Sequence, residues 1–378
     1  MSRDRLEWFS GSDALAFLDS PAASCGSSLL EPTVFNTLAW QRASARYLLN
    51  GRTLLLVVWA DANAKAAWTA FTWGRESFSG VPASTLRLLG YPASDRYSLQ
   101  FDAAPGNIQQ LALALRVCPR NWDLAIFDEL LDDDATRLEM VARMSDWPMK
   151  ARRRHCASSP LLDLVGGNDA VQASYSSSLR TRLRRARKKL EQAGRAEFTR
   201  LQPSPENIDT WVDRIAVVEK ASWKGLNGVG IFEPGLRQQF FRSAARELAR
   251  DGYVDLGLLH LDGQLIAYRF GLRYGGRYLD YNFAHLPEFA ELSPGRLLFE
   301  HLITSSTALG LKAIDASRGS IEKPHLLADW PTSRVEHYAL WLRAPTVTGR
   351  VLHWLAQTAR PAVRHLTARL VSDNPRQS

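Results

Sequence analysis

The stretch Glu291–Leu302, ELSPGRLLFEHL, combines two signals that decide how the second half of the chain folds. Ser293, Pro294 and Gly295 form a small-residue turn, and an amphipathic helical pattern begins directly after it. Proline is favoured in the first turn of a helix, and the free N–H groups there carry partial positive charge. Gly295 lets the backbone approach an anion closely and Arg296 adds charge, so the turn is either an ordinary helix start or a phosphate site.

Strands precede and follow this helix. Residues 253–286 have the pattern of three antiparallel strands, joined by turns at Asp262–Gly263 and Gly275–Gly276. The helix that starts at Ser293 ends at Gly310, and the run LKAIDAS follows as a strand. The second half is therefore predicted to be a mostly antiparallel sheet flanked by helices.

The first half repeats this order of elements. A helix within residues 33–51 corresponds to a helix over 236–251, two strands meet near Asp61–Asn63, a short apolar helix covers 108–117, and WDLAIFDEL is a buried strand. Moving the chain by 201 residues superimposes Gly51 on Gly252, Asp61 on Asp262 and Ala66 on Ala267. The pattern predicts two similar halves, and a chance agreement of common hairpin residues is the alternative.

A strongly basic helix lies between the halves. Leu179, Leu183, Ala186 and Leu190 form one apolar stripe, and seven of the ten residues from Arg180 to Lys189 are basic. The helix is either docked through its leucines with a solvated basic face, or it contacts an acidic cofactor, a substrate or RNA phosphates. Aromatic residues do not interleave with the charges, which disfavours a dedicated nucleic-acid module but leaves tRNA open.

Composition narrows the classes further. The 378-residue chain has a net charge of +8, which favours acidic partners, and its three cysteines match no metal or disulfide pattern. We expect a cytoplasmic protein, because no signal peptide and no apolar run of about 20 residues are present. Motifs of serine hydrolases, zinc peptidases and P-loop or dinucleotide-binding proteins are missing. The basic amphipathic tail 345–372 either packs across the domain, which we favour, or lies on the inner membrane surface.

Several stretches, in order along residues 33–343, resemble one family. The element order is that of the GNAT acyltransferases, and the chain more closely resembles the CelD-like acyltransferases related to the FemAB peptidyltransferases. The stretches that carry the resemblance are FNTLAWQRASARYLLNG, SSLRTRLRRARKKLEQAG, SWKGLNGVGIF, LHLDGQLIAYRFGLRYGGRYLDYNFAH, LSPGRLLFEHLITSSTALGLKAIDASRG and EKPHLLADW.

The resemblance implies an α/β protein of two GNAT-like halves, each a mostly antiparallel sheet flanked by helices. The expected division is a lead-in (1–32), a degenerate N-terminal half (33–150), a linker with the basic helix (151–195), a catalytic C-terminal half (196–344) and a tail (345–378). Such enzymes move an acyl group from acyl-CoA, acetyl-CoA or longer, to an amine of a sugar, amino acid or peptide, without a metal. Envelope or polysaccharide metabolism is the expected setting. The alternatives are a Fem-like transferase that uses aminoacyl-tRNA and a non-catalytic scaffold.

The resemblance also implies roles for individual residues. Ser293, Gly295 and Arg296 would hold the donor pyrophosphate, with Ser293 at a position that is usually glycine-like, and the backbone near Asn282 and Phe283 would stabilise the thioester oxygen. Each candidate for catalysis or acceptor binding can also be explained by a purely structural role, because its residue type is common in ordinary strands and loops. The catalytic candidates are Asp315, His285 and Tyr281, and the candidate acceptor contacts are Trp223, Lys224, Glu322 and Lys323.

Overall fold

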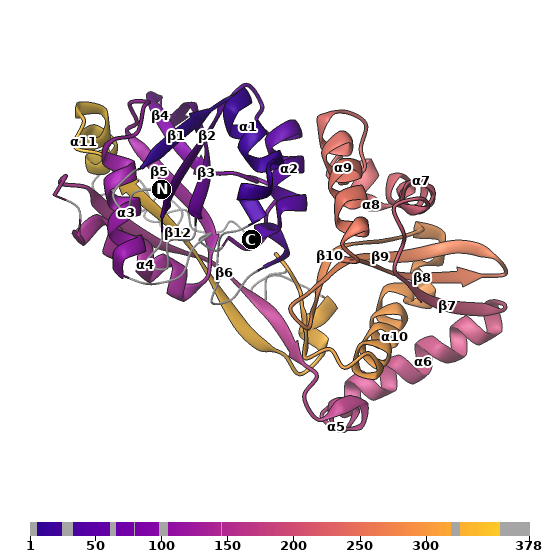
Figure 1. The fold of residues 1–378 in the computed structure, drawn as a ribbon. Coiled ribbons are helices and arrows are strands. Elements are labelled where there is room, and N and C mark those ends of the chain that lie inside the picture. The colour runs from indigo at the N-terminus through magenta and orange to yellow at the C-terminus, as the bar shows by residue number, and fades with distance from the viewer. Residues whose placement is uncertain are drawn as a thin grey trace, which may run out of the picture.

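The computed structural model of the protein describes residues 6–24, 33–60, 66–78, 80–97, 105–144, 146–318 and 326–355. Figure 1 shows two halves that lie side by side and share a sheet. The fold class predicted from the sequence is confirmed, because a mixed sheet is flanked by helices in both halves.

The N-terminal half begins with a short strand and two helices, followed by a meander and two further helices. Its elements are β1 (Glu7–Ser10), α1 (Ser12–Asp19), η1 (Pro21–Ser24), η2 (Val34–Asn36), α2 (Leu38–Tyr47), β2 (Thr53–Ala60), β3 (Ala66–Phe78), β4 (Val81–Leu88), α3 (Pro105–Arg116), β5 (Leu124–Leu130) and α4 (Asp132–Met144). The helix expected within 33–51 is shortened, because Thr33 and Asn36 cap a separate turn and Thr37 caps α2 at the amide of Trp40.

The C-terminal half contains the basic helix and a second meander. Its elements are α5 (Gly167–Ala173), α6 (Ser177–Ala193), β7 (Ala196–Leu201), α7 (Ile208–Ala221), α8 (Trp223–Leu226), α9 (Leu236–Arg250), β8 (Val254–Leu261), β9 (Gln264–Tyr274), β10 (Arg277–His285), η3 (Pro287–Leu292), α10 (Pro294–Ala308), β11 (Ala313–Asp315) and η4 (Leu326–Asp329). Moved by 201 residues, β2 falls end to end on β8, so the repeat seen in the sequence marks equivalent strands.

Two long strands link the halves. They are β6 (Lys150–Asp163) and β12 (Ser333–Arg343), after which α11 (Val347–Trp354) follows. Among the described residues, the strand order of the sheet is β1-β2-β3-β4-β5-β12-β6-β11-β10-β9-β8-β7. The N-terminal strands therefore continue into β12 from the end of the chain, and the C-terminal strands continue into β6. The sequence analysis assigns 151–195 to a linker and basic helix, whereas the structure gives its first part to β6.

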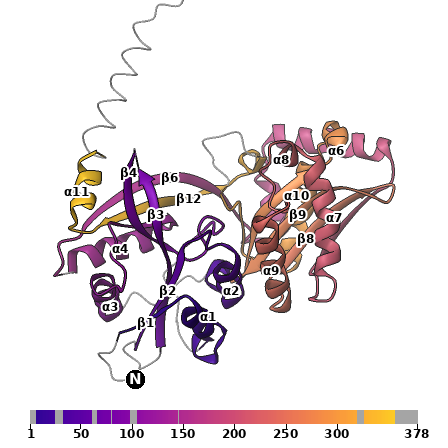
Figure 2. The same cartoon turned by 90° about the horizontal axis from the view of Figure 1, so that it is seen from above.

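Helices cover both faces of the sheet. In the N-terminal half, α3 and α4 lie on one side of the strands and α1 and α2 on the other (Figure 2). The strand β2 is buried on both sides, with Leu55, Val57 and Trp59 facing α3 and α4, and Leu54, Leu56 and Val58 facing α1 and α2. In the C-terminal half, α7 and α9 lie on one side and α6 and α10 on the other (Figure 1).

Aromatic side chains hold the halves together beside the sheet. The ring of Trp40 from α2 packs edge-on against Phe240 of α9, with 5.1 Å between ring centroids. Phe35 and Tyr281 complete this cluster. Within the described residues, no helix is both long enough and apolar enough to span a bilayer.

Candidate active site

The strands β10 and β11 separate in the middle of the C-terminal half. Their parallel pairing covers three positions, Arg277 with Ala313, Tyr278 with Ile314 and Leu279 with Asp315. Beyond Leu279, β10 continues to His285 alongside β9 only, with a bulge between Asp280 and Asn282. We call this divergence the C-terminal fork, with a β10 arm (280–285) and a β11 arm (315–318). Bulges redirect backbone groups, so the β10 arm can present an amide to a ligand in the fork.

The two faces of the sheet at the fork differ. Tyr278 points toward α10, because the guanidinium of Arg200 lies over its ring and also bonds Ser305 and Ser306 of that helix. Neighbouring strand residues alternate, so Leu279 points to the opposite face. Leu279 and Asp315 there line a cavity of about 640 Å³ between the halves. The fork thus has a helix start on one face and a cavity on the other.

The predicted phosphate turn begins α10. Ser293 adopts a left-handed conformation with φ 55°, and its carbonyl accepts bonds from the amides of Arg296 and Leu297. Pro294 has no N–H, and the amide of Ser293 bonds the carbonyl of Ala290. In the part of the chain that the structure describes, the Gly295 amide is the one first-turn donor with no partner. The turn therefore has one unpaired backbone donor, on the buried Gly295, which is fewer than the sequence suggests.

Arg296 is already engaged by a carboxylate. Its guanidinium lies 2.6 Å from Asp329 of η4, and Arg182 of α6 lies 3.1 Å from the other oxygen of the same carboxylate. The three side chains are partly exposed. A phosphate that reaches this turn therefore meets two arginines bridged by an internal anion.

A buried arginine ties the turn to the β10 arm. Arg269 of β9 pairs with Asp280 and donates to the carbonyl of Gly295 at 3.0 Å. Its guanidinium also lies 4.6 Å from the ring centroid of Phe283. A Cβ at Gly295 would lie 2.3 Å from that ring, so glycine is required for this close approach.

On the other face, a buried polar cluster holds Asn282. The amide of Asn282 donates to Glu219 of α7 at 2.6 Å and to the hydroxyl of Tyr268 at 2.9 Å, and its oxygen accepts from Lys224. Burial lowers the pKa of Lys224, against the attraction of Glu219 and Asp280, which raises it. Glu219 also accepts the amide of Phe232 at 2.7 Å. The structure thus brings the two candidates Lys224 and Asn282 together, and they bond each other inside the domain.

Tyr281 and His285 occupy different environments. The hydroxyl of Tyr281 donates to the carbonyl of Ala93 in the N-terminal half at 2.7 Å, and burial raises its pKa well above the ordinary value. Tyr281 is therefore a contact between halves rather than a free base. His285 is half-buried and stacks on Phe283 with ring centroids 5.6 Å apart, and burial lowers its pKa. A neutral imidazole at neutral pH can accept a proton.

Asp315 lies at the base of the fork and is buried. Its Oδ1 accepts from Arg96 at 2.7 Å and from the amide of Ser317 at 2.8 Å. Oδ2 bonds no side chain or amide among the described residues, and Asp315 contributes to the cavity wall. The carboxylate can therefore accept a hydrogen bond from a molecule in the cavity while Arg96 holds it in place.

The remaining candidates lie at the surface or outside the described ranges. Trp223 is 55% exposed at the start of α8. Glu322 and Lys323 lie outside the described residues. In the ranges that the structure describes, no group of three or more His, Cys, Asp or Glu side chains could hold a metal ion.

The equivalent fork of the N-terminal half is closed. The strands β4 and β5 also pair at three positions that end at Arg87 and Ile126. Arg87 then bonds Asp128 across the gap at 2.7 Å, and the chain returns so that the amide of Tyr97 bonds the carbonyl of Glu129. Among the described residues of this half, β4 and β5 are therefore bridged where β10 and β11 separate.

The splayed, bulged strand pair beside a helix start lies within a segment of the C-terminal half that is similar to a GNAT-type acetyltransferase domain. Residues 177–323 match the acetyltransferase (GNAT) domain family, which covers the fork, α10 and the basic helix. This match supports the acyltransferase activity that the sequence predicts. No curated protein matches the sequence.

Solved structures with the same fold span nearly the whole chain. FemX is 11% identical with a TM-score of 0.56, covering 88% of this chain and 96% of its own. The C-terminal domain of a putative lysylphosphatidylglycerol synthetase from Agrobacterium fabrum is 11% identical with a TM-score of 0.51, covering 83% and 91%. A conserved protein from Bacteroides thetaiotaomicron has 11% identity, a TM-score of 0.50 and coverage of 87% and 97%. At this identity the similarity is one of fold.

Sequence reasoning missed the residues that act through long-range contacts. Arg96, Asp329 and Arg269 carry no local motif, because the ion pair of Arg96 joins residues 219 apart, that of Asp329 with Arg296 joins residues 33 apart, and that of Arg269 with Asp280 crosses a hairpin. Glu219 lies on an apolar helix face beside Ile215 and Val218, which is a weak signal for a buried carboxylate.

Proposed function

We propose that the protein is an N-acyltransferase that moves an acyl group from acyl-CoA to an amine acceptor at the C-terminal fork. The divergence of β10 and β11 beyond Leu279 and Asp315, inside the matched acetyltransferase domain, carries the proposal. The cavity lies on one face of the fork and the α10 turn on the other, so donor and acceptor would approach the fork from opposite sides.

The chemistry needs little from side chains. The acceptor nitrogen, as a free amine, attacks the thioester carbonyl, a C–N bond forms, and the C–S bond breaks to release CoA thiolate, which takes up a proton. The oxygen of the tetrahedral intermediate gains negative charge, which a backbone amide of the bulged β10 arm would stabilise. The proton lost by the amine needs an acceptor, and Oδ2 of Asp315 is the candidate on the cavity side. His285, whose pKa burial lowers, stacks on Phe283 at the α10 face and would serve an amine that reaches through the fork.

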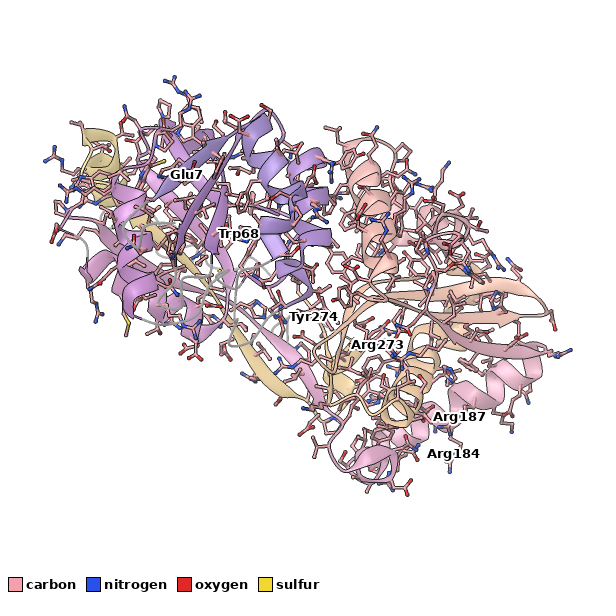
Figure 3. All side chains as sticks on the ribbon, in the orientation of Figure 1. Glu7, Trp68, Arg184, Arg187, Arg273 and Tyr274 are labelled. Atoms are coloured by element: carbon pink, nitrogen blue, oxygen red, sulfur yellow. The ribbon has the colours of Figure 1, made fainter. Side chains whose placement is uncertain are left out.

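The two substrates would use different faces. Arg296 and the Gly295 amide would contact the donor phosphates after displacing Asp329. The acceptor amine would lie in the cavity, where Oδ2 of Asp315 can accept a hydrogen bond from it. The cavity also contains Arg277 and Arg334 at exposed positions and Tyr274 at the end of β9, between the halves (Figure 3). The same lining carries the carboxylates of Asp132, Asp133 and Glu336, so an acceptor with both an amine and an anionic group, such as an amino acid or a peptide, would meet partners of both charges.

A donor carried on tRNA is the alternative with a specific observation in its favour. On α6, Arg184, Arg185 and Lys188 are exposed and bond no other described residue, and Arg184 lies at the outer edge of the molecule (Figure 3). These three positions fall on one side of the helix and form an unpaired basic strip. Such a strip can bind phosphates of a nucleic acid backbone. A non-catalytic scaffold, membrane contact through 345–372 and a cytoplasmic setting remain predictions.

The test is a thermal-shift and binding series with CoA, acetyl-CoA and longer acyl-CoAs. A ligand at about 100 times its Kd adds roughly 2.7 kcal/mol to the stability of the folded state. Arg296→Gln should weaken CoA binding, whereas Arg184→Gln should not, because Arg184 lies on the outer side of α6. Acyl transfer that needs charged tRNA and depends on Arg184 would favour the alternative. No binding of any thioester and no transfer from tRNA would refute an enzymatic role.

A further inference from the structure

One segment of the N-terminal half contacts both arms of the C-terminal fork. The carbonyl of Ala93 accepts the hydroxyl of Tyr281 on the β10 arm at 2.7 Å. On the β11 arm, Arg96 pairs with Asp315 at 2.7 Å and Asp95 pairs with Arg318 at 2.8 Å. Further bonds join Asp95 to Ser317, and the Ser94 carbonyl to Arg318. We call residues 93–96 the cross-half segment.

The cross-half segment is itself fixed to the N-terminal half. The indole N–H of Trp40 donates to the hydroxyl of Ser94 at 2.8 Å, and the amide of Ser94 bonds the carbonyl of Gly90. Directly after the segment, Tyr97 pairs with Leu130 beside β5. The segment is anchored at both ends, so it can hold the fork rather than follow it.

The ion pairs between the cross-half segment and the β11 arm are largely buried, so their charges have lost most of their favourable contact with water. Asp95 and Arg96 are 6% and 3% exposed, and Asp315 is also buried. Buried ion pairs contribute little net stability compared with apolar packing, but they fix geometry because a displaced charge would be left unpaired. An apolar contact would hold the halves together equally well. The charged contacts instead fix where each arm of the fork stands.

We propose that the cross-half segment sets the width of the C-terminal fork, with Asp95 and Arg96 as positioning residues for acyl transfer. The proposal rests on the proposed function, because it assigns a purpose to the N-terminal half of an enzyme whose reaction takes place in the other half. Reactive groups must be held within fractions of an ångström, and a misplacement of about 1 Å can reduce the rate about 100-fold. The closed fork of the N-terminal half is what places this segment, since Tyr97, which pairs beside β5, directly follows residues 93–96.

Substitutions in the cross-half segment should lower the rate of acyl transfer without weakening donor binding. We expect Arg96→Gln to lower kcat by about 10-fold or more while KM for the donor stays within about twofold, since Arg96 touches neither substrate phosphate nor thioester. Arg96→Lys should recover part of the rate, because it restores the charge opposite Asp315. Asp95→Asn should act in the same direction through Arg318.

A matched control separates positioning from general loss of stability. Arg52 of the N-terminal half is a largely buried arginine that pairs with Glu76 and bonds Thr72 and Thr85, and none of these contacts involves the cross-half segment. Arg52→Gln should destabilise the fold and leave kcat within about twofold of the parent. If Arg52→Gln lowers kcat as much as Arg96→Gln, the loss follows stability and the proposal is wrong.

Hydrogen exchange tests the same proposal without using activity. In Arg96→Gln, amides of residues 280–285 and 315–318 should exchange at least about 10-fold faster, while those of β2 and β3 stay as in the parent. Unchanged exchange in both arms would overturn the proposal. If the parent protein neither binds nor uses any acyl-CoA, the proposed function fails, and hydrogen exchange still decides whether the segment holds the fork.

Discussion

Gly295→Ala tests the packing of the predicted donor turn against the β10 arm. The new Cβ would lie 2.3 Å from Cζ of Phe283 and about 3 Å from both neighbouring ring carbons. Carbon atoms in contact are ordinarily about 3.5–4.0 Å apart, so the ring or the helix must move by more than about 1 Å. The ring cannot move freely, because Arg269 lies over it and His285 stacks on it.

The expected loss of stability follows from two opposing effects. Overpacking a filled site costs about 1–3 kcal/mol. Alanine in place of glycine in a helix returns up to about 1 kcal/mol, and less in the first turn. We therefore expect a net loss of about 1–2 kcal/mol, measured as a fall of about 0.5–1 M in the urea midpoint of unfolding.

Gly106→Ala in α3 is the matched control, because no heavy atom lies within 4 Å of the Cβ position and its φ is ordinary. This change should be neutral or slightly stabilising. The double variant Gly295→Ala/Phe283→Leu should lose less stability than the sum of the single changes, because a smaller side chain leaves room for the Cβ. Equal midpoints for Gly295→Ala and Gly106→Ala, or strictly additive effects, would refute the packing described above.

Three further outcomes follow from charged groups. Asp329→Asn should lower the Kd for CoA about fivefold in calorimetric titration, because Arg182 and Arg296 would lose their shared carboxylate partner. An unchanged Kd would exclude the α10 turn as the phosphate site. Burial alone would raise the pKa of Glu76, but the hydrogen bonds and charge of Arg87 lower it from 4.5 to about 2, so the stabilisation is present above pH 4.5 and lost as the pH falls to about 2. The urea stabilities of the parent and Arg87→Gln should therefore converge over that range, and a constant difference would contradict this assignment. Glu219→Gln should lower the free energy of unfolding by about 1–3 kcal/mol, because the new NH2 group would face hydrogen-bond donors. The control Glu247→Gln should change it by less than about 0.5 kcal/mol. Similar losses in both variants would argue against the buried cluster around Glu219.

Local patterns predicted the elements that carry the chemistry. The hairpin turns at Asp262–Gly263 and Gly275–Gly276 join β8, β9 and β10 as expected, because few residues other than glycine adopt the backbone angles of tight turns. The start of α10 was predicted from Pro294 in its first turn. The repeat of 201 residues identified equivalent strands, since turn residues are kept where two strands of similar length must meet.

The connection between the halves could not be predicted. The strand β6 begins with a polar, exposed segment that contains Arg152, Arg153 and Arg154, which lacks the alternation of a half-buried strand. It is ordered because β12 pairs with it from the far end of the chain. Long-range pairing of this kind leaves no local trace, so the segment has the composition of a linker.

The candidate site was predicted by type of residue more than by role. Asp315 was expected at the end of its strand, facing a cleft, and the structure places it there, but its engagement by Arg96 depends on a loop 219 residues away. Tyr281 has the residue type of a proton donor or acceptor, yet its hydroxyl contacts Ala93 in the other half. Strand periodicity shows on which face a side chain lies, but not what stands opposite, because that depends on tertiary packing.

The two halves of the chain thus contain equivalent pairs of diverging strands that differ in whether the gap between them is bridged. In the N-terminal half, Arg87 and Asp128 bridge the gap, and Tyr97 continues the pairing beside β5. The residue directly before Tyr97, Arg96, reaches the base of the other fork and pairs there with Asp315. Loss of a site in one half and support of the site in the other therefore come from the same short segment. If this link is correct, restoring an opening in the N-terminal half by removing the Arg87–Asp128 bridge should not create a second site, because Tyr97 would still pair with β5.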